Sequence, residues 1–389
     1  MSRATHVVLA FGVLGALLLE PVAVYSHTPI TTNVTYQKEI AKIFQRTCMR
    51  CHAEGNLAMS LTTYTDARPW AVAIKEEILE RRMPPWSAVS GYGHFANDGS
   101  LTSREVSVIL SWATGGAPSG VLRNEESTPP VIVPALNGWD TGTPDQILSV
   151  GETHIVAADS GNTTARFEVA TGLAAPKWLQ ALQFDPGDRR VAQWAAVYEA
   201  GTNRWLGGWT PLSITSRLPD GVALLLPVGA RLVVEVGYRG AAEPVSGEGS
   251  VGLYFTDKRP AAVANPMAIT APPTSVAAGA MNQRVRLEKT MTQDSMAGAL
   301  WPDLGMGARS LEVTAIRPDG SVEPMLWLED YKAQWRSPYV FRDPVSLPAG
   351  TRVVVTAYFD NAGVAVLQAR AGVTVTAWAS SRPASTPSP

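Results

Sequence analysis

Cysteine and histidine are scarce in this chain, which narrows the chemistry that it can carry. Among 389 residues there are two cysteines, Cys48 and Cys51, and five histidines. A zinc site built on the cysteine pair would need a second pair of ligands. The only histidines outside the cysteine motif are His6, His27, His94 and His154. The sequence therefore argues against a structural zinc site.

The chain also lacks a large excess of either positive or negative charge. The formal net charge is -2 and 17% of the residues are charged, so nothing indicates nucleic-acid binding. With 46% hydrophobic residues, the composition is that of an ordinary globular chain, long enough for about two or three domains. The 33 glycines and 29 prolines favour many short strands over long helices beyond the first third of the chain.

Both cysteines belong to one motif, Cys48-Met49-Arg50-Cys51-His52. This C-x-x-C-H pattern is typical of c-type haem attachment, because two thiols at this spacing can each add to a haem vinyl group. The adjacent imidazole of His52 then lies where it can bind the iron. The alternative is a redox disulfide, which would usually follow a strand in a βαβ unit. We therefore predict one covalent haem c.

The N-terminus has the features of a secretory signal. Arg3 precedes a 13-residue apolar run at 7–19, and Pro21 follows before small or tolerated residues that end at Ser26. We predict a signal peptide at 1–26 and a periplasmic mature chain, where covalent haem attachment takes place. The alternative is an uncleaved anchor, although the run is shorter than the roughly 20 residues that a membrane span needs. Cleavage after Ser26 would leave His27 as a terminal residue able to chelate copper.

The following segment, residues 27–121, has a helical pattern. Helices are predicted over 37–46, from 65 or 66 to 81 with Asp66 as the cap, and over 102–114 with Thr102 or Ser103 as the cap. Pro84 and Pro85 end the second helix. This order of helices around C-x-x-C-H resembles class I cytochrome c, which implies a small all-α domain whose last helix crosses the first near Phe44.

That resemblance implies a thioether as the sixth iron ligand, from the loop before the last helix. Met83 lies there, with prolines after it. Met59 is the weaker alternative, because it lies only seven residues past His52 and would need an awkward turn. A second histidine ligand, His94, is a further alternative. Ligation by His52 and Met83 leaves no open position on the iron, which favours electron transfer over oxygen chemistry.

Beyond residue 121 the sequence changes character. A proline-rich linker is predicted at 122–145, and strand-like runs separated by Pro-x-Gly turns follow it. The clearest runs are 166–169, 232–236, 251–255, 311–315 and 352–356. We predict two all-β jelly-roll or sandwich domains, at 146–260 and 261–380, and a disordered tail at 381–389. The predicted fold class is thus multidomain, a small all-α class I cytochrome c domain followed by two all-β domains.

The whole chain resembles a group of exported bacterial proteins in which a cytochrome c domain is fused to a β module. That module is like the copper type II, ascorbate-dependent monooxygenases, with the fold of peptidylglycine hydroxylating monooxygenase. In the N-terminal part the resemblance rests on Cys48-x-x-Cys51-His52, Met59-Ser60-Leu61, Tyr64-x-Asp66-Ala67-Arg68-Pro69-Trp70, Arg82-Met83-Pro84-Pro85-Trp86, Gly93-His94-Phe95 and Trp112-x-x-x-Gly116-Ala117-Pro118. In the β region it rests on Arg190-Val191, Val197-Tyr198, Leu226-Pro227-x-Gly229, Gly252-Leu253-Tyr254, Pro318-Asp319-Gly320, Tyr331, Trp335, Tyr339, Leu347-Pro348-Ala349-Gly350-Thr351 and Asp360-Asn361.

The copper ligands of that family are not matched. Its His-His pair falls at Gln193-Trp194, its His-Tyr pair at Gly237-Tyr238, and its His-x-His at 303–305. Past His154 the chain has no histidine. Copper sites of this kind need imidazoles with a thioether. The resemblance therefore implies a fold, and the sequence gives no reason to expect copper or monooxygenase activity.

Two functional hypotheses follow. The first is an electron-transfer protein whose β module acts as a scaffold or docks onto a redox partner protein, as an extrinsic subunit of a membrane electron-transfer complex. The second is a monooxygenase-like oxidoreductase that receives electrons from the haem at a site in the β region. The missing histidines favour the first hypothesis. No catalytic residue and no small-molecule substrate are evident from the sequence, and the adjacent Glu329-Asp330 would point to opposite faces of a strand.

Overall fold

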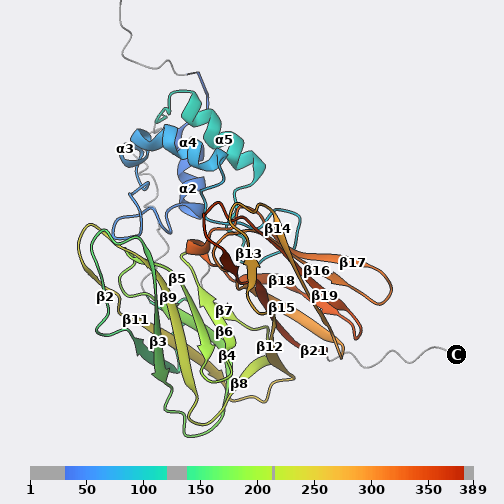
Figure 1. Ribbon diagram of the computed structural model, residues 1–389. Helices are drawn as coiled ribbons and strands as arrows, with labels where there is room; N and C mark the ends of the chain where they lie inside the picture. Colours follow the sequence, from blue (N-terminus) through green and yellow to red (C-terminus); the bar gives the residue numbers. More distant parts are fainter. Residues whose placement is uncertain (1–30, 121–137, 213–214, 381–389) are drawn as a thin grey trace, which may run out of the picture.

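The computed structural model describes residues 31–120, 138–212 and 215–380 (Figure 1). A helical segment, residues 31–120, lies above a β module that comprises residues 138–380. The β module has two halves, which lie side by side beneath the helices. The predicted signal peptide at 1–26, His27, most of the predicted linker and the predicted tail at 381–389 fall outside the described residues.

The helical segment contains short helices. They are η1 (Tyr36–Ile40), α2 (Ala41–Thr47), α3 (Tyr64–Ala67), η2 (Arg68–Trp70), α4 (Ala71–Leu79) and α5 (Ser103–Thr114). Thr102, one of the two predicted caps, caps α5 in a capping box with Glu105. Thr63 rather than Asp66 caps α3, because its hydroxyl accepts the Asp66 amide while the Asp66 carboxylate accepts hydrogen bonds from Ser60 and Thr62. The described residues contain no helix that is long and apolar enough to cross a membrane.

A small aromatic core holds these helices together. The rings of Phe44 and Trp112, from α2 and α5, are perpendicular with centroids 6.2 Å apart. Tyr36 packs edge-on against Phe44, and its hydroxyl donates a hydrogen bond to the Leu61 carbonyl at 3.0 Å. All three rings are nearly inaccessible to solvent. The core therefore joins the segment before the cysteine motif to the final helix.

The described residues of the first half of the β module form eleven strands. They are β1 (Gln146–Val150), β2 (Ile155–Val156), β3 (Asn162–Ala170), β4 (Lys177–Asp185), β5 (Ala192–Glu199), β6 (Arg204–Trp209), β7 (Ser216–Arg217), β8 (Val222–Leu226), β9 (Arg231–Arg239), β10 (Val245–Ser246) and β11 (Gly249–Thr256). Alternating or continuous burial along β1, β4, β5 and β9 places one face of each strand in a core.

The second half contains ten strands and a short 3-10 helix. They are β12 (Ala262–Thr270), β13 (Thr274–Val276), β14 (Gln283–Thr290), β15 (Ser295–Pro302), β16 (Ala308–Ile316), β17 (Val322–Leu328), η3 (Ala333–Trp335), β18 (Tyr339–Leu347), β19 (Arg352–Phe359), β20 (Leu367–Ala369) and β21 (Gly372–Ala379). All five strand-like runs of the sequence lie within strands, namely β3, β9, β11, β16 and β19.

Each half is a sandwich, and the two sandwiches share a sheet. A nine-stranded sheet has the order β1-β11-β4-β8-β12-β21-β15-β18, with β7 beside β4. The four-stranded sheet β3-β9-β5-β6 belongs to the first half, and β14-β19-β16-β17 belongs to the second. Parallel pairing of β12 with β8 at Ala262 and Val263 joins the halves. The predicted boundary at 260/261 therefore falls just before a strand that belongs to the shared sheet.

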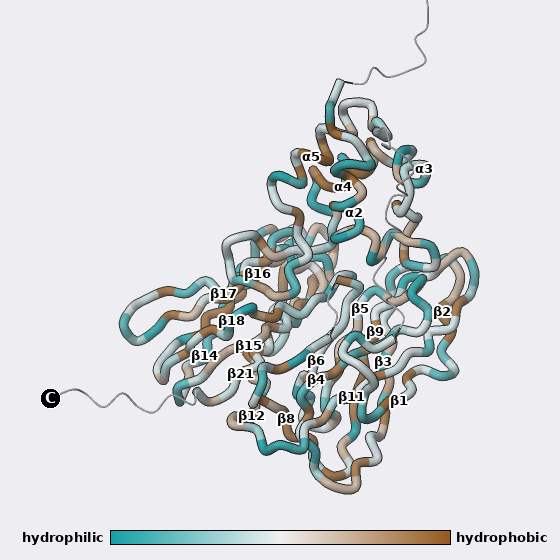
Figure 2. Tube along the Cα trace, turned by 180° about the vertical axis from the view of Figure 1, so that it is seen from behind, coloured by the Kyte–Doolittle hydropathy of each residue, from teal (hydrophilic) through white to brown (hydrophobic). Residues whose placement is uncertain are grey.

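Three hydrophobic clusters hold the β module together. One lies in each sandwich, and the third joins β5, β6 and β9 of the first half to β15 of the second. Hydrophobic residues accordingly recur along the strands of both halves, as Figure 2 shows from behind. The joint cluster consists of Trp194, Ala196, Tyr198, Trp205, Val233, Ala299 and Trp301. The halves are thus packed against each other as well as paired.

The predicted small all-α class I cytochrome c domain is wrong. The described chain is mainly β, and its longest helix, α5, has 12 residues. Between α4 and α5 the chain leaves the helices and joins the β module, where Ala88 bridges to Leu328 of β17 and Phe95 bridges to Phe341 of β18. Phe95 is a member of the second sandwich's core. The helices are therefore a small layer attached to a β protein, because this loop buries its aromatic residues in the sandwich.

Candidate cofactor site between helices and strands

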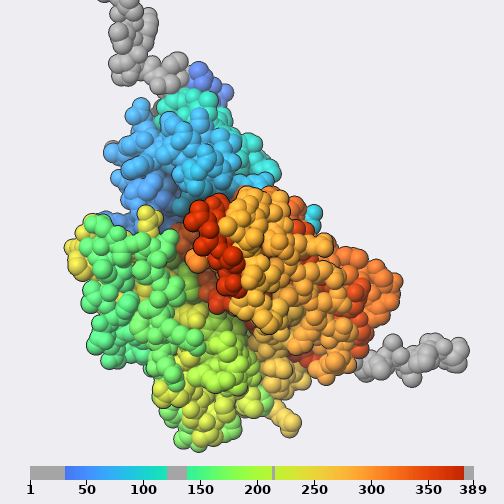
Figure 3. All heavy atoms as spheres, viewed as in Figure 1, coloured from blue at the N-terminus to red at the C-terminus, as the bar shows by residue number. Residues whose placement is uncertain are grey.

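Cys48, Cys51 and His52 of the cysteine motif line one cavity, which lies where the helical segment meets both β halves. Figure 3 shows the helices seated on the ends of both halves. The cavity has a volume of about 130 Å³ and is open at its mouth. Its wall consists of Thr47, Cys48, Cys51, His52, Leu57, Ala58, Met59, Leu61, Ala73, Ile74, Glu77, Ile78, Met83, Pro84, Pro85, Leu101, Gln193, Leu212, Arg239 and Trp335. Most of these side chains are apolar.

Backbone hydrogen bonds place the motif against this cavity. Cys48 follows α2 directly, and its amide donates to the Phe44 carbonyl at 2.8 Å. The amides of Cys51 and His52 then both donate to the Cys48 carbonyl, at 3.0 and 2.9 Å. This tight turn brings both thiols and the imidazole to the same cavity, which the spacing of the motif predicts. Arg50 of the motif lines a neighbouring cavity instead.

The two thiols are not poised for disulfide chemistry. Both cysteines are free. Burial raises the pKa of the Cys48 thiol to about 12, and it raises the pKa of the Cys51 thiol to about 12 as well. Thiol–disulfide enzymes need a cysteine with a lowered pKa in a partly exposed, electropositive setting. The surroundings of this pair are those of a structural or cofactor-bearing pair.

The His52 ring is held by one hydrogen bond to the backbone. Its Nδ1 lies 3.1 Å from the Met59 carbonyl oxygen, which fixes Nδ1 as the donor and leaves Nε2 as the free acceptor. Burial lowers the pKa of His52 and so favours the neutral ring. A ligating histidine usually donates its other ring nitrogen to a backbone carbonyl or a carboxylate in this way.

Two methionines reach the cavity from different sides of the motif. The Met59 backbone lies behind the His52 ring, where its carbonyl accepts the Nδ1 hydrogen bond. Met83 comes from the loop after α4, and Pro84 beside it also lines the cavity. Both methionines line the cavity, so the structure brings Met83 and the alternative Met59 to the same site. His94 lines a different cavity and is exposed.

The residues present fit a c-type haem. Two thiols, one imidazole with a free Nε2 and one thioether converge on a predominantly apolar cavity, which is the donor set that such a group requires. The β module contributes four wall residues that the sequence analysis did not connect with the motif, namely Gln193, Leu212, Arg239 and Trp335. They lie more than a hundred positions from the motif, so local patterns gave no sign of them.

The positions that match the copper ligands of the resembled family are occupied by other contacts. The Trp194 indole fills the space above Gly237, where an added Cβ would lie 2.0 Å from the indole Nε1. A side chain at position 237 would therefore displace the tryptophan. The Tyr238 ring is buried and its hydroxyl donates to the Gly247 carbonyl at 2.7 Å.

Asp303, at the third of these positions, is paired with arginines. Its carboxylate lies 2.9 Å from Arg336 and 3.0 Å from Arg370. The Arg336 guanidinium in turn lies over the rings of Trp194 and Trp301, at 4.8 and 5.3 Å from their centroids. This cluster of charges and aromatic rings packs the junction of the two sandwiches. Among residues 31–120, 138–212 and 215–380, no group of three or more His, Cys, Asp or Glu side chains could hold a metal ion.

Comparisons with known proteins add little to this geometry. No protein-family model and no curated protein sequence matches the chain. Among solved structures, the major capsid protein P2 from bacteriophage PM2 aligns over 60% of this chain and 97% of its own, with 11% identity and a TM-score of 0.26. PNGase F, a glycosylasparaginase from Flavobacterium meningosepticum, aligns over 61% and 97%, with 12% identity and a TM-score of 0.26. Both TM-scores are under 0.5, so neither likeness supports a conclusion about function.

Proposed function

We propose that this chain is an exported c-type haem protein that transfers electrons through a single haem. Cys48 and Cys51 would bind the haem covalently, and His52 and Met83 would bind its iron. The carrying observation is the convergence of these four side chains on one apolar cavity. The β module would act as a scaffold and as the docking surface for a redox partner protein or a membrane electron-transfer complex in the periplasm.

The cofactor would supply a one-electron change at iron, and the chain's own residues would set its environment. Thioether bonds from the two cysteines would hold the group in the cavity. The Met59 carbonyl holds the His52 ring through Nδ1 and would leave Nε2 free to bind the iron. A Met83 thioether would close the sixth position and raise the reduction potential, which suits electron transfer. The predominantly apolar wall would limit water near the iron.

The test is metal and redox analysis of the full chain, produced in a bacterium that exports it and attaches haem c. We expect one iron per chain, no copper, a c-type reduced spectrum and a reversible one-electron titration. The matched control is the same chain produced without the haem-attachment machinery, which should carry no covalent haem. Purified chain without iron would overturn the proposal, and so would stoichiometric copper with ascorbate-dependent turnover.

A further inference from the structure

The β module contributes a polar corner to a cavity that is otherwise mainly apolar. Gln193 and Arg239 are the two polar side chains that this module contributes to the cavity wall. They come from neighbouring antiparallel strands, because Gln193 lies near the start of β5 and Arg239 ends β9. Both strands present these ends toward the helical segment, so both side chains reach the cavity that holds Cys48, Cys51 and His52.

A β-bulge aims Gln193. In the β5–β9 ladder Ala192 pairs with Tyr238 and Trp194 pairs with Gly237, so Gln193 is the extra residue between them. Bulges of this kind redirect a side chain from the regular alternation of a strand. The redirected amide lines the cavity rather than entering a sandwich core.

The Gln193 amide has no partner of its own. The residue is only 2% exposed. Within the described ranges its side chain makes no hydrogen bond, and its two polar atoms are not among the fully buried atoms that lack a partner, so they face the cavity. A buried amide at the wall of a cavity therefore indicates that the occupant of the cavity supplies the hydrogen bond.

Arg239 brings a positive charge to the same corner. Among the described residues it is the only lysine or arginine in the cavity wall. Its side chain forms no ion pair with another described residue, and the exposed residue lies at the cavity rim. The other acidic or basic group in the wall besides His52 is Glu77, which is already paired with Arg82 at 2.8 Å. The free guanidinium is thus the part of the wall best suited to a carboxylate.

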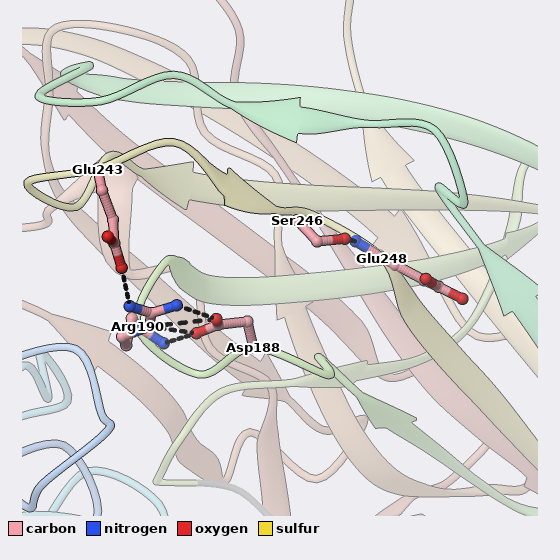
Figure 4. Close-up of polar contacts among 5 residues, drawn as sticks. All are labelled: Asp188, Arg190, Glu243, Ser246 and Glu248. Atoms are coloured by element: carbon pink, nitrogen blue, oxygen red, sulfur yellow. Dashed lines mark hydrogen bonds and ion pairs between the residues drawn. The ribbon is translucent and has the colours of Figure 1, made fainter.

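Ion pairs fix the loops that carry these ends. Figure 4 shows Arg190 between Asp188 and Glu243, with nitrogen-to-oxygen distances of 2.7 and 2.6 Å. Arg190 precedes β5 and Glu243 follows β9, so this contact ties together the loops that flank Gln193 and Arg239. The Arg239 amide also donates to the Val191 carbonyl at 2.8 Å. These contacts therefore hold the polar corner in place without a cofactor.

We propose that Gln193 and Arg239 bind the propionate carboxylates of the haem, so that the β module completes the cofactor site and raises its reduction potential. This inference rests on the proposed function, because it requires haem in the cavity. Haem has an apolar porphyrin face and an acidic edge with two propionates, and guanidinium groups bind carboxylates with charge-assisted hydrogen bonds. A positive charge beside the haem favours the reduced iron, so the β module is a positioning and tuning element rather than a passive scaffold.

The experiment measures the reduction potential of the haem-loaded full chain. Arg239→Gln should shift the equilibrium toward oxidised iron by about threefold to tenfold, about 30–60 mV at 59 mV per tenfold. The matched control is Arg231→Gln, at the other end of the same strand, where Arg231 pairs with Glu168 away from the cavity. It should leave the potential unchanged. Arg239→Lys keeps the charge and should restore most of the potential, and Gln193→Leu should give a smaller decrease.

Four results distinguish the outcomes. A decrease in Arg239→Gln that Arg239→Lys reverses and Arg231→Gln lacks supports the proposal. A haem-loaded chain in which Arg239→Gln and Arg231→Gln have the same potential overturns it and leaves the proposed function intact. An unchanged potential in Gln193→Leu removes Gln193 from the proposal. A wild-type chain without haem overturns the proposed function itself.

Discussion

The helical segment and the β module differ in what each contributes. The helical segment has a small core of short helices, and it carries every candidate ligand of the cofactor. The β module has two sandwich cores and a third cluster between them, and it carries none of those ligands. Its contribution to the cavity is one wall. The candidate cofactor ligands therefore lie on the smaller part of the chain. The larger part supplies one wall of the cavity that surrounds them.

The variant with the largest expected effect on one part alone removes both thiols. Replacing both cysteines, in Cys48→Ala/Cys51→Ala, should abolish covalent haem completely because no other thiol exists in the chain. The β module should keep its fold, since its cores are separate from the motif. Haem staining of denatured protein and far-UV circular dichroism measure the two effects. Covalent haem in the double variant would contradict the assignment, and a lost β spectrum would show that the two parts are not separable.

The second prediction concerns the loop that joins the helical segment to the β module. Phe95 is 5% exposed and packs against Tyr339 and Phe341 of the second sandwich, with ring centroids 5.3 and 5.4 Å away. Phe95→Ala should lower the free energy of unfolding by about 3–5 kcal/mol. Chemical denaturation measures this loss.

The matched control is Tyr92→Ala in the same loop. Tyr92 is 37% exposed and touches Trp327 edge-on at 4.8 Å, so its loss should cost about 1 kcal/mol. Equal losses in the two variants would show that the loop is not anchored through Phe95. A large loss for Phe95→Ala alone would sharpen the picture of a helical layer attached to the sandwich by this residue.

A third test separates the two methionines within the helical segment. Met83→Ala should remove the thioether-to-iron charge-transfer band and lower the reduction potential, shifting the equilibrium by at least about tenfold, about 59 mV. Met59→Ala is the control and should keep the band, because the Met59 backbone carbonyl, which holds His52, is unchanged. Loss of the band in Met59→Ala and its persistence in Met83→Ala would reverse the assignment.

The smallest effect compares buried tyrosines in the two parts. Desolvation raises the pKa of Tyr36 to about 12 in the folded chain, from an ordinary value of 10.0. Its contribution to stability is therefore fully present below about pH 10 and is lost as the pH rises through about 12. Tyr36→Phe should cost about 1 kcal/mol at neutral pH through the lost hydrogen bond to Leu61, and it should flatten the alkaline decline of the helical segment.

The counterpart in the β module is Tyr238→Phe. Burial also raises the pKa of Tyr238, and its hydroxyl donates to Gly247 within the first sandwich. This variant should change the alkaline unfolding of the sandwich and leave that of the helical segment as it was. Thermal unfolding from pH 9 to 12, followed by haem absorption and by far-UV circular dichroism, measures the two parts. Identical pH profiles in both variants would mean that the two parts unfold together.

The sequence predicts the local features of this molecule and misses those that depend on distant contacts. The cap at Thr102 or Ser103 and the five strand-like runs are local patterns, and the structure has the cap at Thr102 and a strand at each run. The separate all-α domain was wrong because Phe95 looks like an ordinary loop residue until β18 lies beside it. Sequence alone also gives no sign that β8 and β12 pair in parallel, since that pairing joins two halves that local patterns treat as independent.

The site shows the same division. Cys48, Cys51 and His52 reach one cavity because their spacing within a single turn dictates it. Gln193 and Arg239 reach that cavity through a bulge in β5 and the register of β9, neither of which can be read from residue types. In the resembled copper monooxygenases, position 193 corresponds to a histidine ligand that this chain lacks. The structure gives it a different setting, at the wall that faces the cysteine motif.

The central claim, that the cavity binds a covalent haem through the cysteine motif, is tested most directly by mass spectrometry of the exported full chain. We predict an intact mass equal to that of the mature polypeptide plus one haem, with the added mass on the peptide that contains Cys48 and Cys51. A mass equal to that of the polypeptide alone, with both thiols free to react with an alkylating reagent after denaturation, would contradict the account.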